Sequence, residues 1–161
     1  MKVLLTGASG MVGRNIINHE FAKTYEWLTP PRVQLDLLNY QSTFDFLFDT
    51  KPDLIIHAAG KVGGIQANLL EPSSFLVENL DIGRNLVMAA SKVGIPRVLN
   101  LGSTCMYPKD KDEPLNESDL LTGPLEPTNE GYALAKIMIW KLCDYLTREN
   151  RHLSYKTLVP C

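Results

Sequence analysis

The sequence predicts an α/β fold, a doubly wound parallel sheet with helices on both faces. Short apolar runs alternate along the 161 residues with longer amphipathic stretches. Strand–helix–strand repetition requires crossover connections, which produce parallel strands and place helices against the sheet. A glycine-rich turn directly after the first run is a second sign, because these folds turn sharply there from strand to helix. A chain of this length buries a substantial core, so one domain is expected.

The predicted strands are short runs rich in Val, Leu and Ile and bounded by turn residues. Pro30 and Pro31 end the second run, and the largely apolar run at 54–59 is typical of a strand covered on both faces. The predicted strands are residues 3–5, 26–28, 33–35, 54–59, 97–101 and 155–159.

The predicted helices carry apolar residues at a helical period, as Val12, Ile16 and Phe21 do in the first one. Gly94 and the proline that follows mark the end of the longest helix. Residues 105–127 contain several prolines and acids and are expected to form an ordered surface loop. The predicted helices are residues 11–23, 42–49, 72–93 and 129–150.

Composition excludes several classes of protein. The net charge of −2 argues against a protein that binds nucleic acid or a membrane surface by electrostatics. No apolar run approaches the ~20 residues that cross a bilayer, and the N-terminal run is too short for a signal peptide. Cys105, Cys143 and Cys161 lack the spacing of a zinc site or disulfide framework. A cytoplasmic location and no metal site are expected.

The glycine-rich turn has the pattern GxxGxxG at Gly7, Gly10 and Gly13. In this context Gly7 permits the tight turn, Gly10 lets a pyrophosphate approach the backbone, and Gly13 lets the helix pack closely on the strand. The helix N-terminus offers free N–H groups to the phosphates. The pattern predicts a dinucleotide site, the alternative being a merely tight strand–helix turn.

The end of the second predicted strand distinguishes the two nicotinamide cofactors. An acid there pairs with a ribose hydroxyl, whereas an Arg accommodates a 2′-phosphate. Here Arg32 follows the strand and the first acid is Asp36, which we expect to accept from the adenine amino group. NADP is therefore predicted, the alternative being that Arg32 is an ordinary surface charge.

Tyr132 and Lys136 lie four residues apart, on one face of the last helix. A nearby ammonium lowers the pKa of a phenol, and such a tyrosine can protonate a developing alkoxide. Ser103 follows a strand at the carboxyl edge of the sheet, where ligands bind, and its hydroxyl can donate to a carbonyl. The alternative for the Tyr–Lys pair is an ordinary surface pair.

Cys105 lies two residues beyond Ser103, in the same predicted cleft. A thiolate there would be stabilised by Lys61 or Lys136. The alternative is a packed small residue, which is the interpretation that fits Cys143 on its apolar helix.

Longer motifs carry a resemblance to a known family. The sequence resembles the extended short-chain dehydrogenase/reductase superfamily and, within it, the GDP-L-fucose synthase family. The marks are GMVG at 10–13, AAGKVGGI at 58–65, LGSTCMYP at 101–108, EPTNE at 126–130 and YALAK at 132–136.

The resemblance implies NADPH-dependent reduction and 3,5-epimerisation of GDP-4-keto-6-deoxy-D-mannose, by a cytoplasmic homodimer. It assigns Ser103, Tyr132 and Lys136 to reduction and Cys105 to epimerisation, with a His partner beyond residue 161. Ser9 stands where some members carry Arg, and Gly60 where Ala is usual. The cofactor contacts implied are Gly7, Ala8, Ser9, Gly10, Met11, Val12, Gly13, Arg32, Asp36, Leu37, Ala58, Ala59, Lys61, Leu101, Gly102, Lys136, Val159 and Pro160.

The chain ends directly after a predicted strand, and members of this family are about twice as long. We therefore expect residues 1–161 to be the NADP-binding domain of a longer protein, without its substrate domain. Two alternatives stay open: a related nucleotide-sugar epimerase or reductase, and a catalytically incomplete dinucleotide-binding module that acts as a sensor or scaffold.

Overall fold

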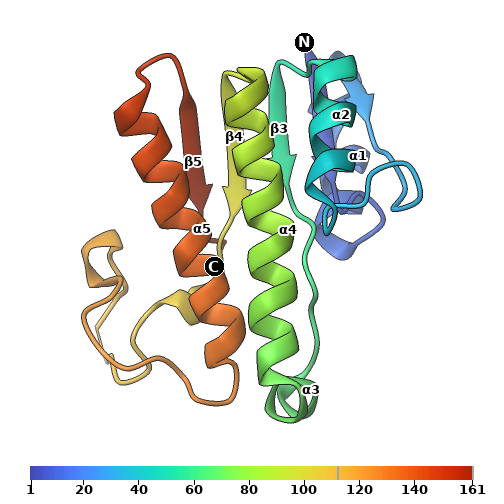
Figure 1. The fold of residues 1–161 in the computed structure, drawn as a ribbon. Helices are drawn as coiled ribbons and strands as arrows, with labels where there is room; N and C mark the ends of the chain where they lie inside the picture. Colours follow the sequence, from blue (N-terminus) through green and yellow to red (C-terminus); the bar gives the residue numbers. More distant parts are fainter. Residues whose placement is uncertain (112, 161) are drawn as a thin grey trace.

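A five-stranded parallel sheet forms the centre of the protein, with the strand order β2-β1-β3-β4-β5 (Figure 1). The structure is a computed structural model that describes residues 1–111 and 113–160. Every neighbouring pair of strands is parallel, which confirms the predicted sheet. The strands are β1 (Lys2–Thr6), β2 (Glu26–Leu28), β3 (Leu54–His57), β4 (Arg97–Leu101) and β5 (Ser154–Leu158).

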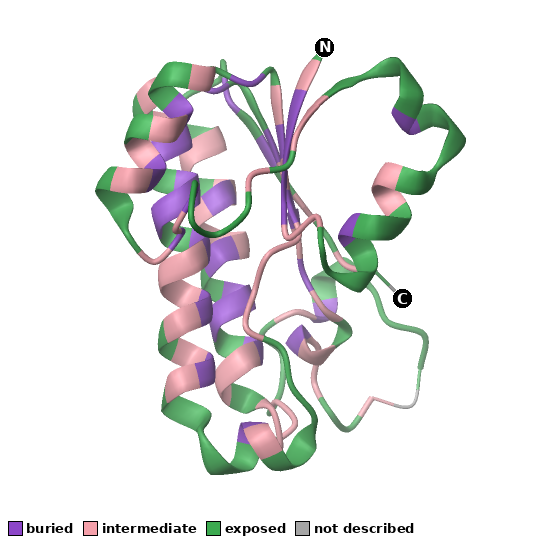
Figure 2. Cartoon of the chain, turned by 90° about the vertical axis from the view of Figure 1, so that its right-hand side faces the viewer, coloured by how far each residue is buried: buried purple, intermediate pink, exposed green. Residues whose placement is uncertain are grey.

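Helices cover the two faces of the sheet unequally (Figure 2). One face carries α2 (Tyr40–Thr50), α4 (Pro72–Val93) and α5 (Glu130–Glu149), with α4 packed between the other two. The opposite face carries α1 (Met11–Asn18) and the 3₁₀ helix η1 (Glu20–Thr24). The doubly wound arrangement is therefore confirmed. The remaining short helices are α3 (Ile65–Leu70), η2 (Thr104–Met106) and η3 (Glu117–Asp119).

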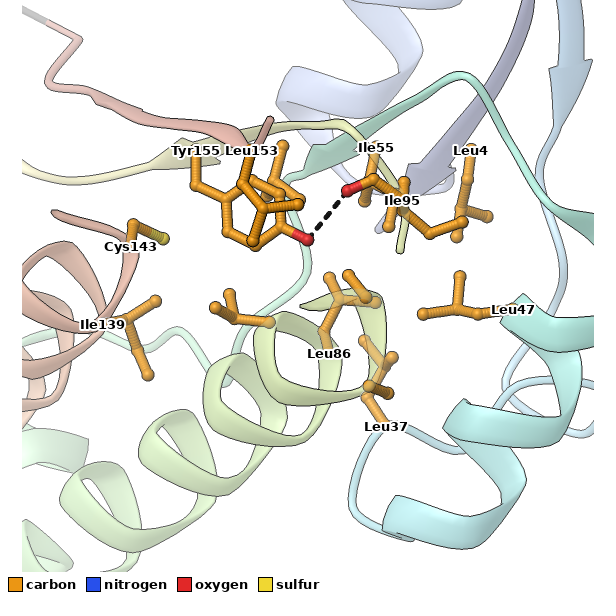
Figure 3. Packing of buried hydrophobic residues seen from close by; sticks show 14 of the residues in the cluster. Leu4, Leu37, Leu47, Ile55, Leu86, Ile95, Ile139, Cys143, Leu153 and Tyr155 are labelled. Carbon is orange, nitrogen blue, oxygen red and sulfur yellow. Dashed lines mark hydrogen bonds between the residues drawn. The ribbon is translucent and has the colours of Figure 1, made fainter. Parts of the chain in front are cut away.

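The main core lies between the sheet and the helices α2, α4 and α5 (Figure 3). Leu4, Ile55, Val98 and Tyr155 occupy one register level of β1, β3, β4 and β5 and point into this layer. The Tyr155 hydroxyl donates to the Ile95 carbonyl at 2.8 Å, so its polar end is satisfied inside the core. Burying each large side chain contributes roughly 1.5–3 kcal/mol.

The predicted strand at 33–35 is wrong. Residues 32–34 form a turn in which the amides of Gln34 and Leu35 both donate to the Pro31 carbonyl, at 2.9 and 3.1 Å. Val33 is 94% exposed, whereas Leu35 packs into the core. The amides after Pro31 thus form local hydrogen bonds instead of pairing with a neighbouring strand. A strand of only three residues would have added little stability to the sheet.

The first predicted helix is shorter than expected. It ends at Asn18, because His19 adopts an extended conformation and its ring accepts from the Phe21 amide at 3.4 Å, opening η1. The long helix α4 ends as predicted, at Gly94, whose φ of 85° is left-handed and whose amide donates to the Ala90 carbonyl. Across residues 1–111 and 113–160, every helix is too short or too polar to cross a membrane.

Candidate active site and cofactor cleft

The strands end at one edge of the sheet because all of them are parallel, and this carboxyl edge is the lower one in Figure 1. The glycine-rich turn of residues 7–13, whose last three residues already belong to α1, follows β1, and the loop of residues 60–64 comes shortly after β3. Ser103 and Cys105 follow β4, and α5 begins at Glu130 on the same side. The sheet therefore gathers the predicted cofactor and catalytic segments at one edge.

The turn of residues 7–13 has no room for side chains at two of its glycines. Gly7 has a left-handed φ of 70°, and a Cβ on it would lie 2.7 Å from the Ala58 carbonyl carbon. A Cβ on Gly13 would lie 2.3 Å from the Gly7 oxygen and 2.5 Å from the Ala8 Cα. Gly13, in the first turn of α1, thus packs against residues 7 and 8, which lie just after β1. This refines the predicted role, in which it packs on the strand. The turn requires glycine at both positions for its own geometry.

A cleft of about 580 Å³ opens beside this turn. The first N–H groups of α1 are available to an anion. The N-cap residue is Gly10, and no side chain among the described residues makes a capping hydrogen bond to this helix start. A glycine-rich turn, a helix start whose N–H groups are free and a cleft of this size together fit a dinucleotide. Of the predicted cofactor residues, the cleft is lined by Gly7, Ala8, Ser9, Arg32, Asp36, Leu37, Ala59 and Lys61.

The other predicted cofactor residues lie elsewhere along the carboxyl edge. Met11 and Val12 line a second, apolar hollow against η1 and β2, and Met11 is 73% exposed. Their cofactor contacts stay predictions. The same holds for Gly10 and Gly13 within the turn, for Ala58, Leu101 and Gly102 at strand ends, for Lys136 on α5, and for Val159 and Pro160 after β5.

Arg32 and Asp36 face each other at the outer end of the cleft, with 3.6 Å between Nε and Oδ1. Asp36 Oδ1 also accepts from the Leu38 amide at 3.2 Å. The Arg32 side chain is 75% exposed and that of Asp36 44%, so solvent screens the pair and it is a weak one. The guanidinium therefore stays open to an anionic ligand, and the adenine contact of Asp36 stays a prediction.

Lys61 does not stabilise the Cys105 thiolate, contrary to one of the two predicted arrangements. Its ammonium turns to α4 and donates to Glu71 and Glu78, at 2.9 Å each. The cation that acts on the Cys105 thiol is Lys136.

The four residues predicted to be catalytic lie together at the carboxyl edge, beyond the end of β4: Ser103, Cys105, Tyr132 and Lys136. The Cys105 thiol donates to the Ser103 Oγ at 3.2 Å. Lys136 is 8% exposed, and its ammonium donates to the Leu101 carbonyl at 2.9 Å and lies 5.6 Å from the centroid of the Tyr132 ring. The structure thus brings all four predicted catalytic residues into one cluster.

The ionisation of this cluster differs from the prediction. Burial, and then the Cys105 sulfur, raise the pKa of Tyr132 to about 12, so the expected lowering by Lys136 is wrong here. Burial also raises the pKa of Cys105, and this effect outweighs the Ser103 hydrogen bond and the Lys136 charge, which both lower it. Burial lowers the pKa of Lys136. The phenol and thiol are both protonated at neutral pH, which suits proton donors.

Sequence reasoning missed Asn79, which is buried in α4 and holds the loop of residues 60–64. Its Nδ2 donates to the Lys61 carbonyl at 3.0 Å, and its Oδ1 accepts from the Lys61 amide at 2.8 Å. A Cβ on Gly60 would lie 2.9 Å from this Oδ1, so glycine at position 60 has a structural consequence that we did not predict. The sequence did contain a sign of this role, because Asn79 is a polar amide on the largely apolar buried face of the helix.

A polar level just inside the edge, buried except for the half-buried Thr157, was also missed. Thr6, His57, Asn100 and Thr157 share one register level of four strands. The Thr6 hydroxyl and His57 Nδ1 are 2.8 Å apart, and Asn100 Nδ2 donates to Thr157 Oγ1 at 3.0 Å. Burial, and then the Lys136 charge, lower the pKa of His57 to about 3, so this ring is neutral. Among the described cysteines, Cys105 and Cys143 are free thiols, and Cys161 lies outside the described residues.

The model of the NAD dependent epimerase/dehydratase family matches residues 3–161. The chain belongs to this family. It is 56% identical over its whole length to a GDP-L-colitose synthase of Yersinia pseudotuberculosis, of which it covers 52%. A GDP-L-fucose synthase of Azorhizobium caulinodans is 43% identical over 99% of this chain and 51% of that protein. The resemblance predicted from the motifs is confirmed, and the chain spans about half the length of the curated relatives it matches.

Solved structures agree with this epimerase/dehydratase fold. A structure named DdhaC matches with a TM-score of 0.94 and 34% identity, over 99% of this chain and 46% of that one. MlghC, a GDP-mannoheptose C4 reductase from Campylobacter jejuni with NADP bound, matches with a TM-score of 0.91 and 26% identity, over 98% of this chain and 50% of that one.

Proposed function

We propose that this chain is the cofactor-binding half of an NADPH-dependent enzyme that epimerises and reduces a GDP-4-keto-6-deoxy sugar to GDP-L-fucose. The observation that carries the proposal is the cluster of Ser103, Cys105, Tyr132 and Lys136 beside a dinucleotide cleft. The similarity to GDP-L-fucose and GDP-L-colitose synthases supports a GDP-sugar substrate. A cytoplasmic homodimer stays a prediction from the sequence.

Three side chains act on the sugar in the successive steps of the reaction. The hydroxyls of Ser103 and Tyr132 donate to the C4 carbonyl oxygen, which makes the neighbouring C3 and C5 protons acidic and stabilises the enolate. Cys105 exchanges a proton at these carbons, with a second acid/base on the opposite face supplied by the other half of the enzyme. Tyr132 then protonates the C4 oxygen during reduction.

NADPH, when bound, supplies the hydride that reduces C4. The glycine turn and the start of α1 would hold its pyrophosphate, and Arg32 would bind the 2′-phosphate. Lys136 would hold the nicotinamide ribose. Two features support the phosphorylated cofactor: an arginine in place of an acid after β2, and the bound NADP of the Campylobacter relative.

A second candidate product is GDP-L-colitose, favoured by the 56% identity to the Yersinia enzyme. Colitose is the 3-deoxy counterpart of fucose, so C3 carries no stereocentre and only C5 needs inversion. Both candidates use the same reduction at C4. They differ in which keto sugar is turned over and in whether C3 must be inverted.

The test uses the complete gene product with GDP-4-keto-6-deoxymannose and with its 3-deoxy analogue. Deuterium entering C3 and C5 is followed by NMR, and reduction by NADPH oxidation. We expect Cys105→Ser to slow exchange at the epimerised carbons while sparing reduction of a keto sugar supplied already epimerised. The substrate turned over faster identifies the product.

The matched control is Cys143→Ser, a thiol on the buried face of α5 that should leave both activities unchanged. Exchange at the wild-type rate in Cys105→Ser would mean that Cys105 is only a packed residue. A complete protein that turns over neither sugar would favour the sensor or scaffold alternative. The 161-residue chain alone is expected to be inactive, since the second acid/base lies outside it.

A further inference from the structure

The loop of residues 60–64 contains a lysine, Lys61, that has no role in the reaction proposed above. The Lys61 ammonium donates to Glu71 Oε2 and Glu78 Oε1 at 2.9 Å each, and to the Ser74 hydroxyl. It also lies 5.1 Å from the centroid of the Phe75 ring. All three N–H donors are therefore used on α4 and its N-cap residue Glu71, and the ammonium is not free for a phosphate.

Two members of this cluster, Lys61 and Glu78, line the cofactor cleft. Glu78 lines the cleft together with Arg32 and Asp36. Its carboxylate accepts from the Ser74 hydroxyl at 2.5 Å and from Lys61. The hydrogen bonds from Ser74 and Lys61, with a further attraction from Arg32, lower the pKa of Glu78. Glu78 is thus an ionised group on the cleft wall, within electrostatic reach of the arginine proposed to bind the 2′-phosphate.

Lys61 offsets that negative charge. Without Lys61, the cluster would hold two carboxylates and no cation, at the wall of a site for an anionic cofactor. The unpaired Glu78 would repel the 2′-phosphate and would also compete for Arg32. NADH lacks this phosphate, so its binding depends much less on the cluster.

We infer that Lys61 is a specificity-determining residue, which favours the phosphorylated cofactor by neutralising Glu78 opposite Arg32 rather than by touching a phosphate. This inference rests on the proposed use of NADPH. Asn79 assists, because its two hydrogen bonds to the Lys61 backbone hold the loop against α4.

The experiment titrates the chain with NADPH and with NADH by cofactor fluorescence at low salt. We expect Lys61→Met to weaken NADPH binding by about three- to tenfold, the effect of roughly one partly screened charge, and NADH binding by less than twofold. The double variant Lys61→Met with Glu78→Gln should restore the wild-type preference to within about twofold. The loss should shrink at high ionic strength.

Lys92→Met is the matched control, because it removes the same charge from the opposite end of α4 and should leave the preference unchanged. Equal weakening of both cofactors, or a loss that Glu78→Gln does not repair, would overturn the inference. If Lys61→Met does not fold, Glu78→Gln alone decides, because it should raise the preference for NADPH by about two- to fivefold. A wild-type chain that binds both cofactors equally refutes the proposed cofactor and this inference together, whereas a preference kept in Lys61→Met refutes this inference alone.

Discussion

At the nucleotide end of the carboxyl edge, the turn of residues 7–13 depends on glycines whose Cβ positions are occupied by backbone atoms. At the proposed catalytic end, functional groups come from the start of η2, where Ser103 and Cys105 lie, and from α5, which carries Tyr132 and Lys136. One end therefore depends on the absence of side chains and the other on their chemistry. Substitutions at the first end should damage folding and binding, and those at the second should damage reaction steps alone.

The largest expected effect is on chemistry at the catalytic end. Tyr132→Phe in the complete gene product should lower reduction by ~10²–10⁴-fold, because the proton donor is lost. NADPH affinity and thermal stability should stay near wild type, since the ring remains. Tyr145→Phe, on the exposed side of the same helix, serves as the control. Near-normal turnover of Tyr132→Phe would remove the tyrosine from the mechanism.

The next effect is on stability at the nucleotide end. Gly13→Ala should lower the free energy of unfolding by about 2–3 kcal/mol, since the methyl group would overlap the Gly7 and Ala8 backbone. Urea denaturation measures it, and NADPH binding should be lost as well. Gly64→Ala is the control, because a Cβ there meets no described atom within 4 Å. Equal stability of the two variants would contradict the close packing of the turn.

Acid should weaken the side-chain contact between Thr6 and His57, which adds to the backbone pairing of β1 with β3. The folded pKa of His57 is lowered to about 3 from 6.5, so below pH 6.5 the unfolded chain binds the extra proton. Stability should fall from pH 6.5 towards pH 3, by at most about 1.4 kcal/mol per pH unit from this group. Urea melts from pH 7 to pH 4.5 should show a shallower fall in His57→Asn. His152→Asn, at an exposed position, is the control, and identical slopes in all three chains would refute the role of His57.

The smallest of these effects concerns the cofactor preference. Arg32→Ala should weaken NADPH binding about tenfold and leave NADH binding within twofold, because the guanidinium is proposed to bind the 2′-phosphate, which NADH lacks. Fluorescence titration with both cofactors measures the ratio. Arg151→Ala, which removes an exposed arginine between α5 and β5, is the control. A ratio unchanged by Arg32→Ala would exclude this arginine from recognition of the phosphate.

Features set by local spacing could be predicted from the sequence alone. The glycine spacing predicted the turn after β1, and Gly94 predicted the end of α4, because both depend on backbone conformations that neighbouring residues dictate. The four-residue spacing of Tyr132 and Lys136 predicted one helix face. The parallel sheet followed from the alternation of strands and helices.

Tertiary structure decided what depends on partners distant in the sequence. The predicted strand at 33–35 did not form, because the turn of residues 32–34 leads Leu35 into a core built from distant elements, away from the sheet. Lys61 found its acceptors on α4, and the pKa of Tyr132 rose because the folded chain buries the phenol. Spacing along the chain determines which residues share an element and an edge. Desolvation and charge pairing depend on distances between elements, which exist only once the sheet and its helices have packed.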